Sequence, residues 1–414
     1  MKSALEILKE VWNYDAFRDI QQDIVENAIA GNDTLALLPT GGGKSICYQV
    51  PGLARGGLCL VISPLIALMK DQVEQLVRRG VEAVAIFSGM SYREIDLELD
   101  NCIAGKYKFL YVSPERLKTD IFLARVQNMN IKLVAIDEAH CISQWGYDFR
   151  PEYLQIADLR NLLPDVPFMA LTASATPAVV KDIAEKLKLK QFKIYKKSFA
   201  RDNLSYIVLN EENKWERMMK IFKNIEGTGI VYVRNRKKTE EIARELKRNG
   251  FSADFYHAGL DHKIRNKKQE DWINNKIRII ASTNAFGMGI DKPDVRVVVH
   301  FEAPDSLESY YQEAGRAGRD GNEAWCVLLF NEADHAEALE RMNAAFPDTE
   351  DITRVYEALN NHLQIPLGAG KDVSYDFDIA RFARSFNLNP LLVFHALKIL
   401  ESGSVLKVNE SVFH

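Results

Sequence analysis

The sequence lacks any apolar run long enough to cross a membrane. Its apolar runs, such as those at 58–62 and 324–330, have the length of strands, whereas a membrane helix needs about 20 consecutive apolar residues. The first residues follow an amphipathic helical pattern, without the apolar core of a signal peptide. We therefore expect no membrane partner and a cytoplasmic location, associated with the nucleoid if the source is prokaryotic.

Cysteine is scarce and the net charge is weak. The five cysteines, at 47, 59, 102, 141 and 326, are scattered without paired spacing. This usage excludes a disulfide framework and is typical of reduced, buried thiols in a cytosolic protein. The formal net charge is −4, so a nucleic-acid partner would have to bind a local basic surface. Short-period repeats and low-complexity segments are also absent.

The sequence does contain two series of short apolar runs separated by segments of helical length. The first series is 34–38, 58–63, 83–87, 108–113, 132–137 and 168–173, and the second is 205–209, 229–233, 252–257, 277–283, 296–301 and 324–330. Runs this continuous are typical of parallel strands buried on both faces. The fold class is therefore α/β, with two parallel-sheet domains at 1–199 and 200–331 that meet at a charged seam near 196–205.

After residue 331 the pattern becomes mainly helical. Segments 332–346 and 352–365 have helical periodicity, and two further helical segments meet at a short turn at Leu388 and Asn389. The segment VLKVNE, at 405–410, reads as a strand, and the sequence ends soon after it. Helix, turn, longer helix and strand is the order of a winged helix. We predict for 332–414 a helical linker and a truncated or degenerate winged-helix-like domain; the alternative is a helical dimerisation or capping unit.

The segment LPTGGGKS, at 38–45, lies between a predicted strand and a predicted helix. Its glycines would let backbone N–H groups approach phosphate oxygens, and the helix N-terminus adds its dipole. Lys44 would reach the terminal phosphates, and the Ser45 hydroxyl would bind Mg²⁺. Leu38 stands where the usual phosphate-loop pattern has its first glycine, and the alternative is a plain glycine-rich turn. The residues predicted to bind nucleotide here are Thr40, Gly41, Gly42, Gly43, Lys44 and Ser45.

A second site feature is the acidic pair in KLVAIDEAH, at 132–140. An apolar strand ends at Asp137 and Glu138, and open α/β sheets bind ligands at the carboxyl ends of their strands. Asp137 would hold Mg²⁺, and Glu138 would polarise the attacking water. Two solvated loop carboxylates are the alternative, but a phosphate loop in the same sheet argues against it. Together the two features predict an ATP- and Mg²⁺-dependent enzyme.

Further segments support a family resemblance. In order along the chain they are PTGGGKS, SPLIALMKDQ, YVSPERL, IDEAHCISQWG, LTASATP, TNAFGMGIDKPDVR and YYQEAGRAGRDG. From about residue 7 to 330 the chain resembles the superfamily 2 helicases, and within them the RecQ family of ATP-dependent DNA helicases. The resemblance implies two RecA-like domains with ATP between them. It also implies 3′-to-5′ DNA unwinding, coupled to translocation on single-stranded DNA, in recombination and repair. We expect single-stranded and forked DNA as partners and a monomeric protein.

The resemblance also assigns nucleotide contacts outside the phosphate loop. In YDAFRDIQ, at 14–21, Tyr14 would stack on adenine, while Arg18 and Gln21 would contact the base. Asp291, in the glycine-rich segment 286–295, would face the nucleotide. Arg316 and Arg319 are three residues apart, so both can reach the γ-phosphate from one side of a turn when the domains close. We expect Arg319 to be the arginine finger, although a solvated basic turn is the alternative.

A third set of residues would contact DNA. The aromatic segment SQWGYDFRPEY, at 143–153, follows the acidic pair directly, and in the RecQ family the corresponding loop senses single-stranded DNA. Bases stack on such rings without regard to sequence. Individually, each member of the set could be a core or surface residue. The DNA-binding residues predicted are Ser63, Ser113, Arg116, Trp145, Tyr147, Phe149, Arg150, Arg234, Arg236 and His257.

The sequence departs from the family in two respects. The four zinc-binding cysteines that usually follow the motor are missing, because no cysteine follows Cys326, and we predict no zinc. Tyr147 stands where the family usually has histidine, so coupling between DNA and nucleotide would lose a group that titrates near neutral pH. Two alternative functions stay open: a DEAH-type RNA helicase, against which segment 143–153 argues, and an ATP-gated DNA-binding or remodelling protein that does not unwind.

Overall fold

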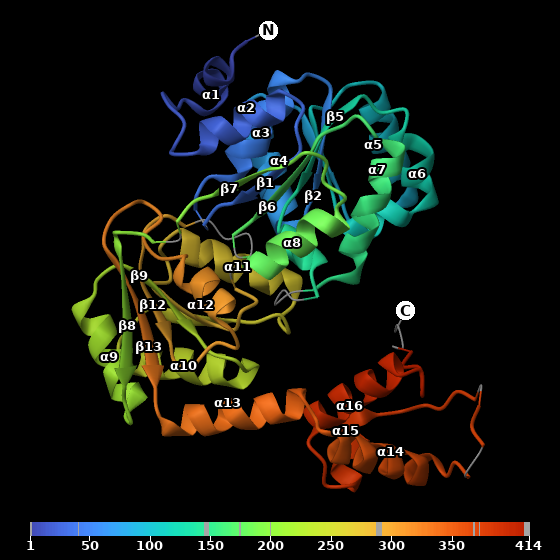
Figure 1. The fold of residues 1–414 in the computed structure, drawn as a ribbon. Helices are drawn as coiled ribbons and strands as arrows, with labels where there is room; N and C mark the ends of the chain where they lie inside the picture. Colours follow the sequence, from blue (N-terminus) through green and yellow to red (C-terminus); the bar gives the residue numbers. More distant parts are fainter. Residues whose placement is uncertain are drawn as a thin grey trace. The chain divides into compact units, whose positions relative to one another are not determined.

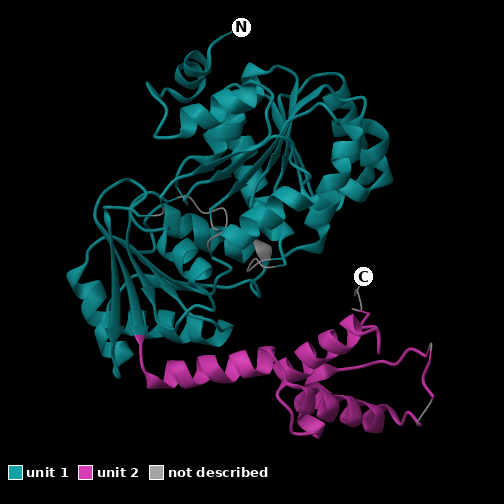
Figure 2. Ribbon diagram, in the orientation of Figure 1, with its two compact units in different colours: residues 1–329 teal, residues 330–414 magenta. Residues whose placement is uncertain are grey.

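The structure, a computed structural model, describes residues 2–39, 41–144, 149–173, 175–198, 200–286, 292–366, 369–371 and 373–409, apart from the side chain of His262. The chain forms two compact units, Met1–Leu329 and Phe330–His414 (Figure 2). In the described residues no helix combines the length and apolar character needed to span a membrane.

The first sheet, in the part of the chain coloured blue to green in Figure 1, contains seven strands in the order β3-β4-β2-β5-β6-β1-β7. Every strand pair recorded in it is parallel. The strands are β1 (Thr34–Leu37), β2 (Leu58–Ile62), β3 (Ala83–Ile86), β4 (Phe109–Val112), β5 (Ile131–Ile136), β6 (Phe168–Thr172) and β7 (Lys193–Lys196). The first six coincide with the predicted apolar runs, which confirms those predictions.

Both faces of the first sheet are buried, which explains why its strands are continuously apolar. In β2, Leu58, Leu60 and Ile62 join one hydrophobic core, whereas Cys59 and Val61 join the other. One face is covered by α1 (Ala4–Trp12), α2 (Gln21–Ile29), α3 (Lys44–Ala54) and α4 (Ile66–Arg78). The other is covered by α5 (Tyr92–Ile103), α6 (Asp120–Val126) and α8 (Pro177–Lys186). Shorter helical segments are η1 (Pro114–Lys118), η2 (Ala139–Ile142), η3 (Pro151–Asp158) and α7 (Leu159–Leu162).

The edge strand β7 was missed by the sequence analysis. Its sequence, KIYK, has no apolar run, and three of its four residues are exposed. The strand is specified by its parallel pairing with β1, in which Ile194 lies opposite Leu35. Charged side chains on such an edge also protect a sheet from pairing with other chains.

A buried ion pair fixes the amino-terminal ends of three neighbouring strands of this sheet. The Asp33 carboxylate accepts hydrogen bonds from the Arg160 guanidinium (2.6 Å), from the Phe168 N–H (2.8 Å) and from the Lys190 N–H (2.6 Å). Both charged side chains are almost fully buried. Removing one partner of such a pair lowers the free energy of unfolding by about 3–5 kcal/mol. Asp33 thus links the amino-terminal ends of β6, β1 and β7, at the opposite ends of the strands from the site described below.

The second sheet contains six strands in the order β10-β11-β9-β12-β13-β8. They are β8 (Leu204–Asn210), β9 (Thr228–Tyr232), β10 (Ala253–Tyr256), β11 (Ile279–Ser282), β12 (Val295–His300) and β13 (Ala324–Phe330), and each coincides with a predicted run. Helices α9 (Lys214–Asn224) and α10 (Arg236–Arg248) pack on one face, and α11 (His262–Ile273) and α12 (Leu307–Ala314) on the other. Two parallel-sheet domains are therefore confirmed.

The second unit is helical in its described residues. Its helices are α13 (Glu332–Ala345), α14 (Thr349–Leu363), α15 (Ile379–Ser385) and α16 (Pro390–Ser402). The two helical segments predicted on either side of Leu388 and Asn389 are confirmed as α15 and α16, and Asn389 caps α16 through its side chain. The predicted closing strand is not formed within 405–409, where the Val408 N–H donates to the Glu401 carboxylate (2.9 Å) rather than to a partner strand.

Candidate nucleotide and DNA sites

The predicted phosphate-binding segment at 38–45, which we call the phosphate loop, connects β1 to α3, and its backbone favours glycine. Gly41 and Gly43 have positive φ angles of 78° and 76°, and Gly43 is the N-cap of α3. A Cβ atom on Gly42 would lie 2.8 Å from the carbonyl oxygen of Pro39. Because Gly43 is the N-cap, Lys44 is the first residue of α3. The backbone N–H groups at the start of a helix have no partner within the helix, so they can bind an anion.

Gln21 lies against the phosphate loop. Its amide nitrogen donates to the carbonyl oxygens of Gly42 (3.1 Å) and Gly43 (3.3 Å), and its amide oxygen accepts from the Arg18 N–H (2.9 Å). The side chain is buried, whereas Tyr14 is exposed. Gln21 thus holds the shape of the loop in this structure, and the adenine contacts of Tyr14, Arg18 and Gln21 stay predictions.

The acidic pair lies beside the phosphate loop. The Asp137 N–H donates to the carbonyl oxygen of Ile62 (2.9 Å), which continues the β2–β5 ladder to the end of β5. Glu138 then turns with a φ of 47°, and its carboxylate lies 3.6 Å from the Lys44 ammonium. The two features that the sequence analysis placed in one site are therefore brought together.

The two carboxylates have opposite electrostatic surroundings. Burial, together with the neighbouring Glu138 carboxylate, raises the pKa of Asp137 to about 6. Burial acts on Glu138 in the same direction, but Lys44, His140 and Arg316 outweigh it and hold its pKa below the ordinary value. An Asp137 carboxylate that lacks sufficient positive charge nearby is a group that a divalent cation would stabilise, so the site fits Mg²⁺ held by Asp137 and Ser45.

We predict that Asp137 lowers the stability of the protein without metal and nucleotide. The pKa of aspartate is near 3.9 in unfolded chains, whereas that of Asp137 in the folded protein is about 6. The contribution of Asp137 to the unfolding free energy is therefore fully present below about pH 4, and it is lost as the pH rises through about 6 and the buried carboxyl becomes charged. Asp137→Asn should therefore raise the unfolding free energy at pH 8 in EDTA, by an amount on the order of 2 kcal/mol. Thermal melts between pH 5 and 8 would measure the difference, which should shrink toward low pH.

Asp33→Asn is the matched control, because that buried aspartate has an arginine partner. It should destabilise the protein across the same pH range. A lower melting temperature for Asp137→Asn than for wild type at pH 8 would contradict the prediction.

Two residues that the sequence analysis did not assign connect the acidic pair to its surroundings. A ring nitrogen of His140 lies 2.9 Å from the Thr172 hydroxyl and 3.3 Å from the Glu138 carboxylate. The Tyr153 hydroxyl donates to the carbonyl oxygen of Asp137 (2.9 Å). Their positions in the sequence could have indicated these contacts, because His140 ends the DEAH motif and Tyr153 ends the aromatic segment. Their contacts join the LTASATP and aromatic segments to the acidic pair.

The second domain contributes arginines to the same site. Carbon atoms of the Arg319 side chain lie 3.5 and 3.8 Å from the position that a Cβ on Gly41 would occupy. Arg316 is buried and close enough to lower the pKa of Glu138. The loop after α12 thus brings Arg319 to the phosphate loop and Arg316 to the acidic pair.

The DNA-binding residues predicted in the first domain follow its strands. Ser63 comes directly after β2 and is buried, while Ser113 and Arg116 lie after β4 and are half-buried. The Arg150 guanidinium donates to the carbonyl oxygen of Pro64 (3.3 Å), and the Phe149 ring centroid lies 5.9 Å from the Lys186 ammonium. Arg150 therefore links the aromatic segment to the segment after β2.

The DNA-binding residues predicted in the second domain follow β9 and β10. The Arg234 N–H donates to the Glu302 carboxylate (2.8 Å). The Arg236 guanidinium lies 2.6 Å from the position that a Cβ on Gly259 would occupy. His257 is buried, with a ring nitrogen 3.6 Å from the carboxylate of Glu240. Arg236 is thus the exposed cation of this group.

Four predicted site residues lie outside the described part of the structure, and their roles stay predictions. They are Thr40, Trp145, Tyr147 and Asp291. Among the described residues, no group of three or more His, Cys, Asp or Glu side chains could hold a metal ion. Mg²⁺ at Ser45 and Asp137 would therefore need water and phosphate oxygens to complete its shell.

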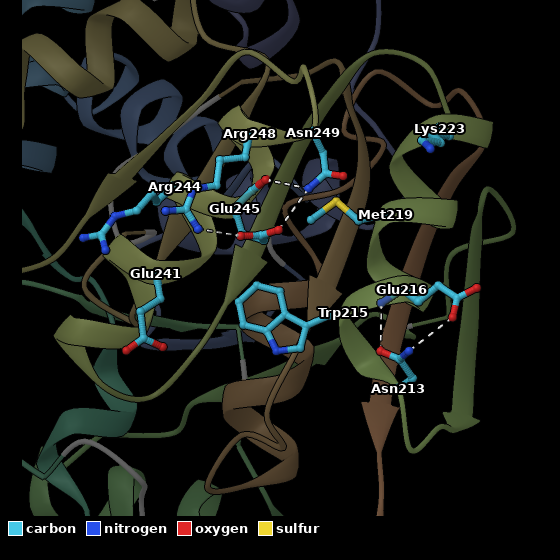
Figure 3. A pocket seen from close by; sticks show the side chains of 10 residues that line it. All are labelled: Asn213, Trp215, Glu216, Met219, Lys223, Glu241, Arg244, Glu245, Arg248 and Asn249. Atoms are coloured by element: carbon cyan, nitrogen blue, oxygen red, sulfur yellow. Dashed lines mark hydrogen bonds and ion pairs between the residues drawn. The ribbon is translucent and has the colours of Figure 1, made fainter.

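A cleft of about 700 Å³ lies elsewhere, between α9 and α10 (Figure 3). Trp215 lines it and packs on Phe301, with ring centroids 5.0 Å apart. Charged side chains of both signs surround it, and Glu245 accepts hydrogen bonds from Arg248 and Asn249. None of the predicted site residues lines this cleft, so it is separate from the predicted nucleotide and DNA sites.

The fold and the site define the class of the two-domain helicases. Residues 18–183 match the family of DEAD/DEAH box helicases, and residues 213–321 match the helicase conserved C-terminal domain. A solved structure of the helicase MrfA bound to DNA has a TM-score of 0.68 and 20% identity, covering 80% of this chain and 51% of that chain. S. cerevisiae Dbp5 bound to RNA and ADP BeF3 has a TM-score of 0.64 and 18% identity, covering 82% and 90%. At such identities the likeness shows the fold alone.

Sequence relatives narrow the class to one family. The ATP-dependent DNA helicase RecQ of Haemophilus influenzae is 45% identical over 81% of this chain and 54% of the relative. The probable ATP-dependent DNA helicase RecS of Bacillus subtilis is 41% identical over 86% of this chain and 73% of the relative. The chain belongs to the RecQ family of ATP-dependent DNA helicases, and it spans about half the length of its RecQ relatives from Haemophilus influenzae and Pasteurella multocida.

Proposed function

We propose that this chain hydrolyses ATP and uses the energy to move 3′-to-5′ along single-stranded DNA and to unwind duplexes in recombination and repair. The observation that carries the proposal is the meeting of Arg319 with Gly41 of the phosphate loop, next to the Lys44–Glu138 pair. Each domain supplies residues that the other lacks, so hydrolysis would depend on the arrangement of the two domains. We place the seam between them at residues 199–200.

In the proposed reaction Lys44 and the loop N–H groups bind the β- and γ-phosphates of ATP. Glu138 accepts a hydrogen bond from the attacking water, and its lowered pKa keeps it ionised for that role. Mg²⁺, held by Ser45 and Asp137, would neutralise charge on the phosphates when bound. Arg319 and Arg316 donate to the γ-phosphate oxygens as negative charge develops there.

Contacts around the acidic pair support coupling of this reaction to DNA. Tyr153 bonds the Asp137 backbone, and Arg150 bonds the segment after β2, so both ends of 150–153 touch site elements. A base stacked on Trp145, Tyr147 or Phe149 would strain these bonds and shift the carboxylates. Phosphate contacts from Ser63, Ser113, Arg116, Arg234, Arg236 and His257 would add affinity that is independent of sequence and sensitive to salt. The proposed partners are single-stranded and forked DNA, bound by a monomer in the cytoplasm or nucleoid.

An ATP-gated DNA-binding or remodelling protein is the second candidate, favoured by the second unit. Within 330–414 acidic residues outnumber basic ones, and residues 405–409 do not form the strand expected of a wing. Such a unit is poorly suited to separating strands through phosphate contacts. In this case the motor would hydrolyse ATP on DNA without unwinding it.

ATPase assays with and without nucleic acid test the proposal against an RNA helicase. Single-stranded DNA should stimulate turnover by wild-type protein, and RNA of the same length and base order should stimulate it far less. Stimulation by RNA alone would overturn the proposal. No turnover with either nucleic acid would remove the enzyme function altogether.

A further inference from the structure

The segment that connects the two domains, residues 197–203, makes a backbone contact beside the phosphate loop. The Lys197 N–H donates to the carbonyl oxygen of Leu37 (3.1 Å), the last residue of β1. The phosphate loop begins directly after this strand. The amino-terminal end of the segment is therefore fixed to the first domain next to the nucleotide site.

The other end of the segment bonds the arginine loop, which we define as residues 315–322. The Arg201 guanidinium donates to the carbonyl oxygens of Gly315 (3.3 Å) and Gly318. The Asn203 amide donates to the carbonyl oxygens of Gly318 (2.7 Å) and Asn322 (2.8 Å). Two side chains thus bond three carbonyls of the loop that carries both site arginines.

These bonds leave the arginine loop little freedom. Gly315 directly precedes Arg316, and Gly318 directly precedes Arg319. Gly318 has a φ of 58°, and a Cβ atom there would lie 2.5 Å from the Asn203 amide nitrogen. The carbonyl oxygen of Asn203 also accepts from the Ala324 N–H (2.9 Å) at the start of β13. The peptide units that orient the two arginines are therefore held from outside the loop.

Chain length limits how far the two anchored ends can separate. Arg201 follows Lys197 by four residues, and four residues span at most about 14 Å. While the Lys197–Leu37 bond is made, the arginine loop cannot move far from the end of β1. The segment thus behaves as a short tether between the phosphate loop and the arginine loop.

We propose that Arg201 and Asn203 are positioning residues for Arg316 and Arg319. They set the orientation of the arginine loop and tie it to the segment whose other end, at Lys197, bonds the first domain, so that domain closure delivers both guanidinium groups to the γ-phosphate. The inference rests on the proposed ATPase function. Neither residue touches the nucleotide; each acts through the carbonyl oxygens that it holds.

A purely structural role is the competing explanation, and the chain offers a matched control for it. The Arg278 guanidinium also donates to carbonyl oxygens in the second domain, those of Gly227 (2.9 Å), Phe222 (2.7 Å) and Ile225 (2.6 Å). These carbonyls lie outside the arginine loop. Arg278→Lys therefore removes bonds of the same kind without changing how Arg316 or Arg319 is held.

The test compares Asn203→Asp and Arg201→Lys with Arg278→Lys and wild type. Asn203→Asp replaces a donor by an acceptor facing two carbonyl oxygens, and Arg201→Lys keeps the charge but cannot bridge two carbonyls. Misplacement of the arginines should lower kcat about 10- to 100-fold, with KM for ATP changed less than about threefold. Arg278→Lys should keep the wild-type kcat even if its melting temperature falls as much.

Affinity for a transition-state mimic gives a readout that loss of stability alone would not change. Wild-type protein should bind ADP more tightly when aluminium fluoride is added, because the arginines contact the γ-phosphate mimic. Asn203→Asp and Arg201→Lys should lose that gain and keep the wild-type affinity for ADP alone. Equal kcat and equal gain in these variants, Arg278→Lys and wild type would overturn the inference. A wild-type protein without turnover would instead contradict the proposed function.

Discussion

Arg319→Ala should lower kcat for ATP by about 10³- to 10⁵-fold, the range that an arginine finger contributes in related phosphoryl-transfer enzymes. The Arg319 side chain lies against Gly41, which places its guanidinium where it can reach the phosphates from the second domain. Alanine removes this charge without altering Lys44 or Glu138. Binding of ATP should therefore change little, and DNA should no longer stimulate turnover. Steady-state ATPase assays with saturating single-stranded DNA measure the effect.

The control for Arg319→Ala is Arg78→Ala in α4. Arg78 is exposed and pairs with Glu74 on the same helix, so its loss should leave kcat unchanged. If Arg319→Ala retained turnover within about threefold of wild type, Arg319 would not be the finger. Arg316, which influences Glu138, would then be the remaining arginine to test.

Lys44→Ala should lose turnover by at least about 10²- to 10³-fold, because a positioned donor to the developing charge is removed. Unlike Arg319→Ala, it should also weaken ATP binding, since in the proposed reaction Lys44 already binds the phosphates in the ground state. In addition, Glu138 would lose the ammonium group 3.6 Å away that helps to keep its pKa low. Equilibrium binding of ATP and steady-state turnover measure the two effects separately.

Lys181→Ala is the control for loss of a lysine in the same domain. Lys181 lies on α8, exposed to solvent and paired with Glu185. It should behave as wild type in both measurements. Turnover by Lys44→Ala at the wild-type rate would mean that the phosphate loop is not the nucleotide site.

The fold could be predicted wherever burial on both faces made a strand continuously apolar. Strands β1 and β2 alternate between two cores, so each residue had to be apolar and the run was visible. The strand β7 was not predictable in this way, because it lies at an edge and is specified by pairing with β1. The strand expected at 405–410 is not formed in its described residues, 405–409, for the opposite reason: its apolar alternation is present, but the described residues offer it no partner strand.

The site was predictable where one motif carries one chemical role. Glycines, a lysine and two carboxylates imply phosphate and metal binding, and the structure brings Lys44 and Glu138 together. Contacts between motifs were not predictable. The adenine contact predicted for Gln21 stays a prediction, whereas the bonds of its amide nitrogen to the phosphate loop were not foreseen. Arg201 and Asn203 lie in a seam whose charge suggested only a linker, and their carbonyl partners lie more than a hundred residues away.

The central claim, that ATP hydrolysis drives 3′-to-5′ unwinding, is tested most directly by strand displacement on DNA duplexes with either a 3′ or a 5′ single-stranded tail. Wild-type protein with ATP and Mg²⁺ should displace the strand from the 3′-tailed duplex and leave the 5′-tailed duplex intact, and Arg319→Ala should displace neither. ATP hydrolysis by wild-type protein without displacement from either duplex would contradict the claim and identify a motor that remodels DNA complexes without unwinding.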